Sequence, residues 1–120
     1  MKHLNLIPNI NIGDFLRLQI DYAVTVYSHI IPSKTFDSVF EFHQAVHISP
    51  TVFDHFNHFK QLKKDELIFI AELKQETYYV KGTGDYYPHL FARVMDSGGE
   101  SIWIQIEQHK RFSYIFSICK

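Results

Sequence analysis

Residues 89–107, HLFARVMDSGGESIWIQIE, decide the expected fold. Two runs in this stretch alternate between apolar and other side chains, and a glycine-containing turn at 96–99 separates them. The regularly spaced apolar residues are Leu90, Ala92 and Val94 in the first run and Ile102, Ile104 and Ile106 in the second. Period-two alternation is typical of strands with one buried face, and so short a connection joins antiparallel strands. The stretch therefore predicts a β-hairpin.

Short β-rich runs also occur on both sides of this hairpin. The strands predicted from residue 66 onward are Leu67–Leu73, Thr77–Lys81, His89–Met95, Ser101–Glu107 and Phe112–Ile118. Turn signals at 82–85 and 96–99, and a polar tip at 108–111, separate these runs and predict an antiparallel meander. Because Leu67–Leu73 is apolar on both faces, we expect it to be the central strand.

The N-terminal half has a different pattern. Even positions from Leu16 to Val26 are all apolar or aromatic, which predicts one long strand after the Gly13-Asp14 turn. Apolar residues at helical spacing then predict a helix over Thr35–Val46. Ser49 as N-cap and Pro50 at the first helical position predict a second helix, which runs to about Lys64.

The expected fold class is α+β. Two short helices pack on one face of a mainly antiparallel sheet of about five to six strands. A chain of 120 residues has room for one core, so we expect a single domain over 1–120. The residues contain no motif that assigns them to a known family.

Charge and composition exclude several classes of function. The formal net charge of -1 gives no overall attraction to phosphate backbones, which argues against a nucleic-acid partner. No apolar run is long enough to form a signal-peptide core or to span a bilayer, which predicts a soluble protein with no membrane partner. The single Cys119 cannot form an internal disulfide, which favours the cytoplasm.

Histidine is unusually frequent, at 8 of 120 residues, and two of these residues suggest a metal site. On a helix, His43 and His47 would share one face, as paired zinc ligands do. Gln44 stands where zinc proteases have their catalytic glutamate, and no third ligand has a diagnostic spacing. The alternative is that both imidazoles belong to a half-buried helix face. We predict no cofactor and treat this pair as the only weak metal candidate.

The predicted hairpin also places chemistry-bearing side chains on the face opposite its apolar residues. This face carries His89, Phe91 and Arg93 on one strand and Trp103, Gln105 and Glu107 on the next. A histidine, an arginine and a carboxylate are the groups of a small metal-independent ribonuclease, with His109 as a further candidate. The other interpretation is a solvated or partner-covered sheet face.

Aromatic residues make up 16% of the chain and suggest a protein-binding surface. Adjacent residues of a strand point to opposite faces, so one ring of Tyr78-Tyr79 must point away from the main core. The predicted partner-binding residues are Tyr79, Tyr86, Tyr87, Trp103 and Arg93. Alternatively, the tyrosine rings close a second small core.

Two functions follow from these patterns. The first is a non-enzymatic protein-binding module, either a homodimer or a stoichiometric inhibitor of the immunity-protein or phage-encoded type. The second is the ribonuclease that uses His89, Arg93 and Glu107. The missing catalytic motif and the absence of a basic charge favour the first.

Overall fold

The structure is a computed structural model that describes residues 9–27, 30–48, 59–106 and 109–119, with the backbone alone at 46–48 and at 109–110. Its strands are β1 (Phe15–Leu18), β2 (Tyr22–Thr25), β3 (Thr35–Phe36), β4 (Phe59–Leu62), β5 (Leu67–Val80), β6 (Asp85–Met95), β7 (Ser101–Ile106) and β8 (Phe116–Cys119). Its helices are α1 (Val39–Phe42), the π-helix η2 (His43–Ile48) and α3 (His109–Ile115). The fold is thus a mainly antiparallel sheet with little helix.

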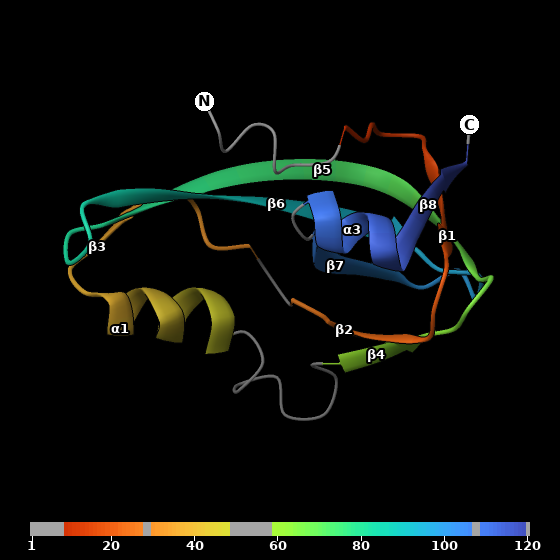
Figure 1. Ribbon diagram of the computed structural model, residues 1–120, viewed down its shortest axis with the longest axis horizontal. Helices are drawn as coiled ribbons and strands as arrows, with labels where there is room; N and C mark the ends of the chain where they lie inside the picture. Colours follow the sequence, from red (N-terminus) through yellow and green to blue (C-terminus); the bar gives the residue numbers. More distant parts are fainter. Residues whose placement is uncertain (1–8, 28–29, 49–58, 107–108, 120) are drawn as a thin grey trace.

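The antiparallel meander predicted from the sequence is present in β5, β6 and β7. The six-stranded sheet has the order β7-β6-β5-β1-β8, and β3 pairs in parallel with the far end of β5. The two predicted strands 67–73 and 77–81 are one strand of 14 residues. β5 is central, as predicted. Together β5 and β6 form a long curved ribbon across the molecule, with α1 near one end and α3, β2 and β4 near the other (Figure 1).

The last predicted strand is wrong in its first half. Residues 109–115 form α3, so residues 109–111 of the expected polar tip begin a helix instead of a hairpin turn. The helix carries the chain across the sheet, and β8 then pairs with β1 rather than with β7. Phe112 and Ile115 are buried in the larger of the two hydrophobic cores, which is called the first core below. The β-like apolar spacing of this segment is therefore also compatible with one short amphipathic helix.

The single long strand predicted over Leu16–Val26 is also wrong, because the chain bends at 19–21. β1 belongs to the large sheet, whereas β2 pairs with β4 in a separate two-stranded sheet. The bend is held by two distant segments: the Gln19 N–H donates to the Ile115 carbonyl, and the Lys64 N–H donates to the Asp21 carboxylate. Leu16, Leu18 and Val24 are nevertheless all buried. The alternation was correct, but the strand is interrupted.

The two predicted helices match the structure only loosely. Residues 35–36 form strand β3, and α1 begins at Val39 with Ser38 as its N-cap, whose Oγ accepts from the Glu41 N–H. From His43 the helix continues as a π-helix. Of the second predicted helix, residues 49–58 lie outside the described residues, and Phe59–Leu62 is strand β4. The helical prediction is therefore wrong at its C-terminal end.

The first core lies on what we call the inner face of the sheet, the face that carries Ile70 and Val94. Every strand except β3, together with α3, contributes to it. Its fully buried members include Leu16, Leu18, Leu62, Ile68, Ile70, Ala92, Val94 and Ile104. The predicted core positions of the β6–β7 hairpin are confirmed, since Ala92, Val94 and the three isoleucines of β7 are buried and Leu90 packs against them.

A second core lies at the other end of the β5–β6 ribbon, on the opposite or outer face. It consists of Phe36, Phe42, Tyr78 and Val80, with Tyr87 packed against it. The change of face follows from the strand register. Ile70 pairs with Val94, but after one bulged residue Glu72 pairs with Arg93, so even-numbered residues of β5 change faces at this point. One continuous hairpin therefore buries opposite faces in its two halves.

Candidate functional site

The tyrosines predicted to bind a partner separate into two groups. Tyr79 and Tyr86 are cross-strand neighbours on the inner face, beyond the end of the first core, with ring centroids 4.8 Å apart. Tyr86 is 63% exposed. Tyr87 instead stacks on Phe42, and its hydroxyl donates to Thr83 Oγ1. Tyr78 is fully buried, and its hydroxyl donates to the Ile31 carbonyl. Tyr78 and Tyr87 thus serve the second core.

Arg93 and Trp103 lie side by side on the outer face, as the sequence predicted. Arg93 Nε donates to Glu72 Oε1 at 2.7 Å, and its Nη1 donates to Ser101 Oγ at 2.9 Å. Trp103 is half-buried, and its carbonyl accepts from the Tyr27 N–H. These contacts bind β5, β6 and β7 to one another and to the segment after β2.

His89 is buried, and the expectation that it lies on an exposed sheet face is wrong. Only 8% of the residue is exposed, and the rings of Tyr78, Phe42 and Phe91 lie 5.4, 5.9 and 6.0 Å from its own. Burial lowers the pKa of His89, because its charged form loses solvation. Sequence alternation gave the correct face of β6, but it could not show that α1 covers that face.

The ribonuclease residues are not assembled by the described part of the chain. His89 lies under Phe42, and Arg93 is ion-paired with Glu72. Glu107 and the side chain of His109 lie outside the described residues. This set of residues therefore stays a prediction, and the burial of His89 weighs against it.

The metal candidate falls on the π-helix. His43 is exposed, and the side chain of His47 lies outside the described part of the structure. The prediction that His43 and His47 share one helix face assumed α-helical spacing, whereas η2 has the wider i to i+5 hydrogen-bond pattern of a π-helix. Among the described residues, no three histidine, cysteine, aspartate or glutamate side chains lie close enough to hold a metal ion.

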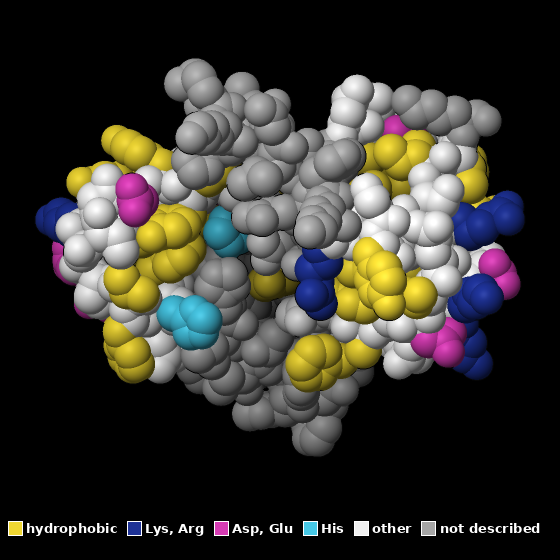
Figure 2. Space-filling model, viewed as in Figure 1, with side chains coloured by type: hydrophobic (Ala, Val, Ile, Leu, Met, Phe, Trp, Pro, Cys, Tyr) yellow, Lys and Arg dark blue, Asp and Glu magenta, His cyan; other side chains and the backbone are white. Residues whose placement is uncertain are grey.

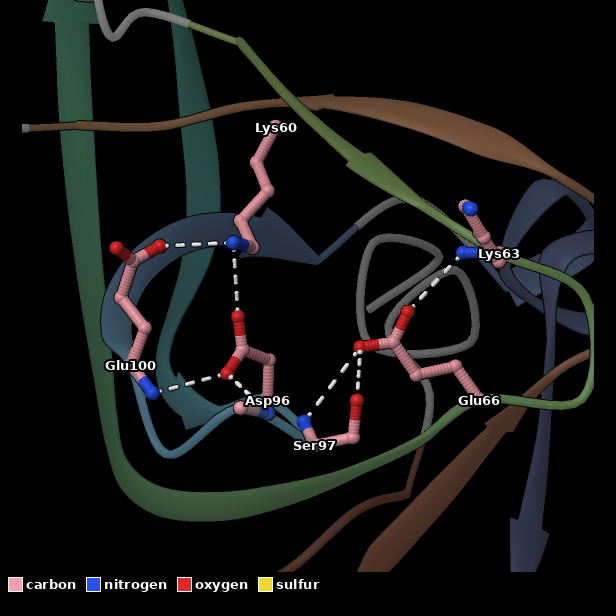
Figure 3. A network of polar contacts seen from close by, with 7 residues as sticks. Lys60, Lys63, Glu66, Asp96, Ser97 and Glu100 are labelled. Atoms are coloured by element: carbon pink, nitrogen blue, oxygen red, sulfur yellow. Dashed lines mark hydrogen bonds and ion pairs between the residues drawn. The ribbon is translucent and has the colours of Figure 1, made fainter.

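A polar network at the other end of the molecule was not foreseen (Figure 3). Lys60 on β4 lies 2.9 Å from both Asp96 Oδ2 and Glu100 Oε1. Asp96 Oδ1 also accepts from the N–H groups of Gly98 and Glu100, which closes the turn between β6 and β7. Glu66 similarly binds Ser97 and the Lys63 N–H. The network ties β4 to two turns.

The charges of this network stabilise one another. Hydrogen bonds to Glu100 and then to Asp96 raise the pKa of Lys60. Burial alone would raise the pKa of Asp96, but the Lys60 hydrogen bond, the Glu100 amide and the Lys60 charge outweigh it, so this pKa is lowered. An open pocket of about 400 Å³ adjoins Lys60 and is lined by Val26, Phe59, Lys60, Glu100, Ser101 and Ile102. Because both carboxylates already bind Lys60, we assign the network to the fold.

Apolar side chains remain uncovered on the outer face, beyond the end of the second core. Cross-strand pairing joins Cys119 of β8 to Phe15 of β1, Phe15 to Phe69 of β5, and Phe69 to Met95 of β6. We call these four residues the outer row. Phe15 is 46% exposed and Met95 39%, while Phe69 and Cys119 are half-buried. Leu67, beside the row, is 41% exposed.

The sequence carried a signal for the outer row that was misinterpreted. Leu67–Leu73 is apolar on both faces, which predicted a strand in the middle of the sheet. β5 is indeed central, but among the described residues its outer face is only partly covered here: Ile68 and Ile70 are fully buried beside the half-buried Phe69. In the view of Figure 2, by comparison, hydrophobic side chains reach the surface in separate patches among polar ones.

Comparison with known proteins finds no matching family model, no matching curated protein and no matching solved structure. Within the described residues, no helix has the length and apolar character needed to cross a membrane.

Proposed function

We propose that the chain is a non-enzymatic protein-binding module and that its binding surface is the outer row with Leu67. The observation that carries this proposal is a line of uncharged side chains across four adjacent strands, of which Phe15, Leu67 and Met95 are 39–46% exposed. Contiguous exposed apolar patches on a folded domain mark interaction surfaces, because their burial by a partner releases water from apolar area.

The position of the row also supports a protein partner. A twisted antiparallel sheet offers a broad and rigid surface, and the strands beneath the row are fixed by Leu16, Ile70 and Val94 on the inner face, each fully buried. The Phe15 and Phe69 rings are in contact, with centroids 5.1 Å apart. A surface already ordered in this way loses little side-chain entropy on binding.

In the described part of the chain, the ion pairs that join strands and turns serve the fold, which favours binding over catalysis. Lys60 holds Asp96 and Glu100, and Arg93 holds Glu72. The Tyr79–Tyr86 pair is a second exposed aromatic surface, but it lies on the inner face at the far end of the ribbon and is smaller.

Covalent footprinting with a short-lived carbene probe tests this function. The protein is labelled dilute and purified, and again in concentrated extract of the cells that produce it. Labelling of Phe15, Leu67 and Met95 should fall at least threefold in extract, while that of Tyr86 should change little. Equal labelling of the row in both conditions, at every protein concentration tried, would contradict the proposed function.

A further inference from the structure

We propose that the second core is a pH-sensitive latch, in which uptake of a proton by His89 releases residues 35–42 from the outer face of the β5–β6 ribbon. These residues, which form β3 and α1, are called the cover. The cover lies at the end of the ribbon away from the outer row, so the latch is independent of the proposed binding surface.

His89 is enclosed by aromatic rings beside the second core. Only 8% of the residue is exposed. The Phe42 ring of α1 stands at 87° to the imidazole, with centroids 5.9 Å apart, and the Tyr78 ring of β5 stands at 78° and 5.4 Å. Phe42 also stacks on Tyr87, which lies two residues before His89 on the same face of β6. Phe42 therefore joins the cover to the imidazole.

A proton on His89 would place a charge among these rings. Backbone hydrogen bonds to Tyr87 and Pro88 favour the charged form, but burial outweighs them and lowers the pKa of His89. Glu76 is the cross-strand neighbour of His89, yet its Oε1 already accepts from the Ser33 N–H at 2.7 Å and from Ser33 Oγ at 2.6 Å. The imidazolium is therefore stabilised most by contact with water.

The other titratable and charged groups around the cover differ from His89 in exposure or in charge. Tyr78 stays neutral in acid, because burial raises its pKa. Arg93, beyond Phe91 on the same face, is ion-paired with Glu72. The exposed groups are Lys34, Asp37, Glu41, His43, Lys74, Lys81 and Asp85. Among the described residues around this core, His89 is thus the buried group whose charge changes in mild acid.

The cover is easier to move than the strand that carries His89. β6 pairs with β5 on one side and, from Leu90 onward, with β7 on the other. β3 has only two residues and α1 only four. The Tyr79 and Lys81 N–H groups hold the cover by donating to the carbonyls of Lys34 and Phe36. Opening so small an element costs less free energy than separating the long strands.

Ser33 provides a hinge just before the cover. Its hydrogen bonds lower the pKa of Glu76, so Glu76 keeps its charge and this anchor persists in mild acid. On the cover itself, the Asp37–Lys81 ion pair contributes little, because its side chains are 74% and 62% exposed. Protonation of His89 should therefore lift the cover beyond Ser33 and leave β5 paired with β6.

Native-state hydrogen exchange between about pH 7.5 and about pH 5 tests the latch. Below about pH 6.5, the opening constant at the amides of Tyr79 and Lys81 should rise by up to about tenfold per pH unit, because the open state binds the proton more tightly. His89→Phe should abolish this rise, whereas His43→Gln, at an exposed histidine after α1, should keep it. An opening constant that does not depend on pH in the wild type would overturn the latch.

Low concentrations of urea distinguish opening of the cover from unfolding of the whole chain. Opening of the cover exposes little surface, so exchange at Tyr79 and Lys81 should be almost independent of urea. The Leu18 amide, which donates to the Glu66 carbonyl beside the first core, should exchange through a larger unfolding and accelerate with urea. The same urea dependence at all three amides would overturn a separate motion of the cover.

An NMR titration of the His89 imidazole tests the same coupling in the opposite direction. Phe42→Ala should raise the pKa of His89 toward its ordinary value near 6.5, because the variant admits water to the ring. Phe40→Ala, the matched control at a 70% exposed position of α1, should leave this pKa unchanged. A wild-type pKa of about 6.5 or above, or one that Phe42→Ala does not change, would overturn the latch. If His89→Phe does not fold, this titration decides.

Discussion

The two halves of the β5–β6 hairpin bury apolar side chains on opposite faces of the sheet. In the half nearer β1, the inner face carries Ile70 and Val94 in the first core, and the outer face carries the exposed row. In the half nearer β3, the outer face carries Tyr78 and Val80 in the second core, and the inner face carries the half-buried Tyr79 beside the exposed Tyr86. Within the described residues, the face that one half buries is thus partly exposed in the other half.

The difference arises at one bulged residue and at the segments that cover the sheet. Between Ile70 and Glu72 the β5 register shifts, so Ile70 and Tyr78 point to opposite faces although both numbers are even. The first core is covered by contributions from five other strands and α3, whereas the second relies on β3 and α1. The half nearer β1 is therefore expected to be the more stable of the two.

The largest expected effect is in the first core. Ile70→Ala should lower the free energy of unfolding by about 2–5 kcal/mol, because it removes buried methyl groups from a fully packed site. Urea denaturation followed by circular dichroism measures this change. A loss below about 1 kcal/mol would show that the first core does not dominate stability.

A smaller and more local effect is expected in the second core. Phe42→Ala should lower the free energy of unfolding by about 1–3 kcal/mol, because the four-residue α1 can move to fill part of the space. Hydrogen exchange should become faster at the amides of Tyr79 and Lys81, which donate to the carbonyls of Lys34 and Phe36, and should change little in β1. Equal acceleration in both halves would mean that the second core is not a separate unit.

The Lys60 network should contribute less than either core. Asp96→Asn keeps an oxygen for the Gly98 and Glu100 amides but loses the charge that faces Lys60, so stability should fall by about 1–2 kcal/mol at pH 7. The folded-state pKa of Asp96 is lowered, so this contribution is present above about pH 4 and is lost as the pH falls through the folded-state value. Chemical denaturation at pH 7 and pH 3 should show the difference between wild type and variant shrinking in acid.

The smallest expected effect is the pH dependence of the second core. Burial lowers the folded-state pKa of His89, so below about pH 6.5 the unfolded chain takes up a proton that the folded chain does not. Stability should therefore decrease from pH 6.5 toward that lower pKa, by no more than about 1.4 kcal/mol per pH unit. His89→Phe should flatten this part of the profile, and the exposed His43→Gln should not. A parallel profile for His89→Phe would exclude His89 as the source.

Local patterns predicted much of the sheet and little of what covers it. The alternation in 89–107 gave the β6–β7 hairpin and its buried face, and the even positions of 16–26 include the buried Leu16, Leu18 and Val24. The same alternation could not show the bend at 19–21, because the Ile115 carbonyl and the Lys64 amide that hold it are distant in sequence.

The sequence predicted a binding surface of exposed aromatic residues on the sheet, but it did not locate the outer row. Exposed aromatic residues on the sheet were expected, and Tyr86 is one of them. The outer row was missed because a strand that is apolar on both faces usually has both faces covered, and only the pairing of Phe69 with Phe15 and Met95 shows the contiguous row. His89 was expected to be exposed, because the sequence does not show that the Phe42 ring contacts it.

Addition of concentrated extract of the producing cells to the isotope-labelled protein, followed by NMR, tests the outer row most directly. The signals of Phe15, Leu67, Phe69 and Met95 should shift or broaden together as extract is added. The signals of Tyr79 and Tyr86 should stay constant. Shifts confined to the tyrosine pair would contradict the account, since they would place the interface on the inner face. Constant signals throughout would contradict the outer row as a binding surface.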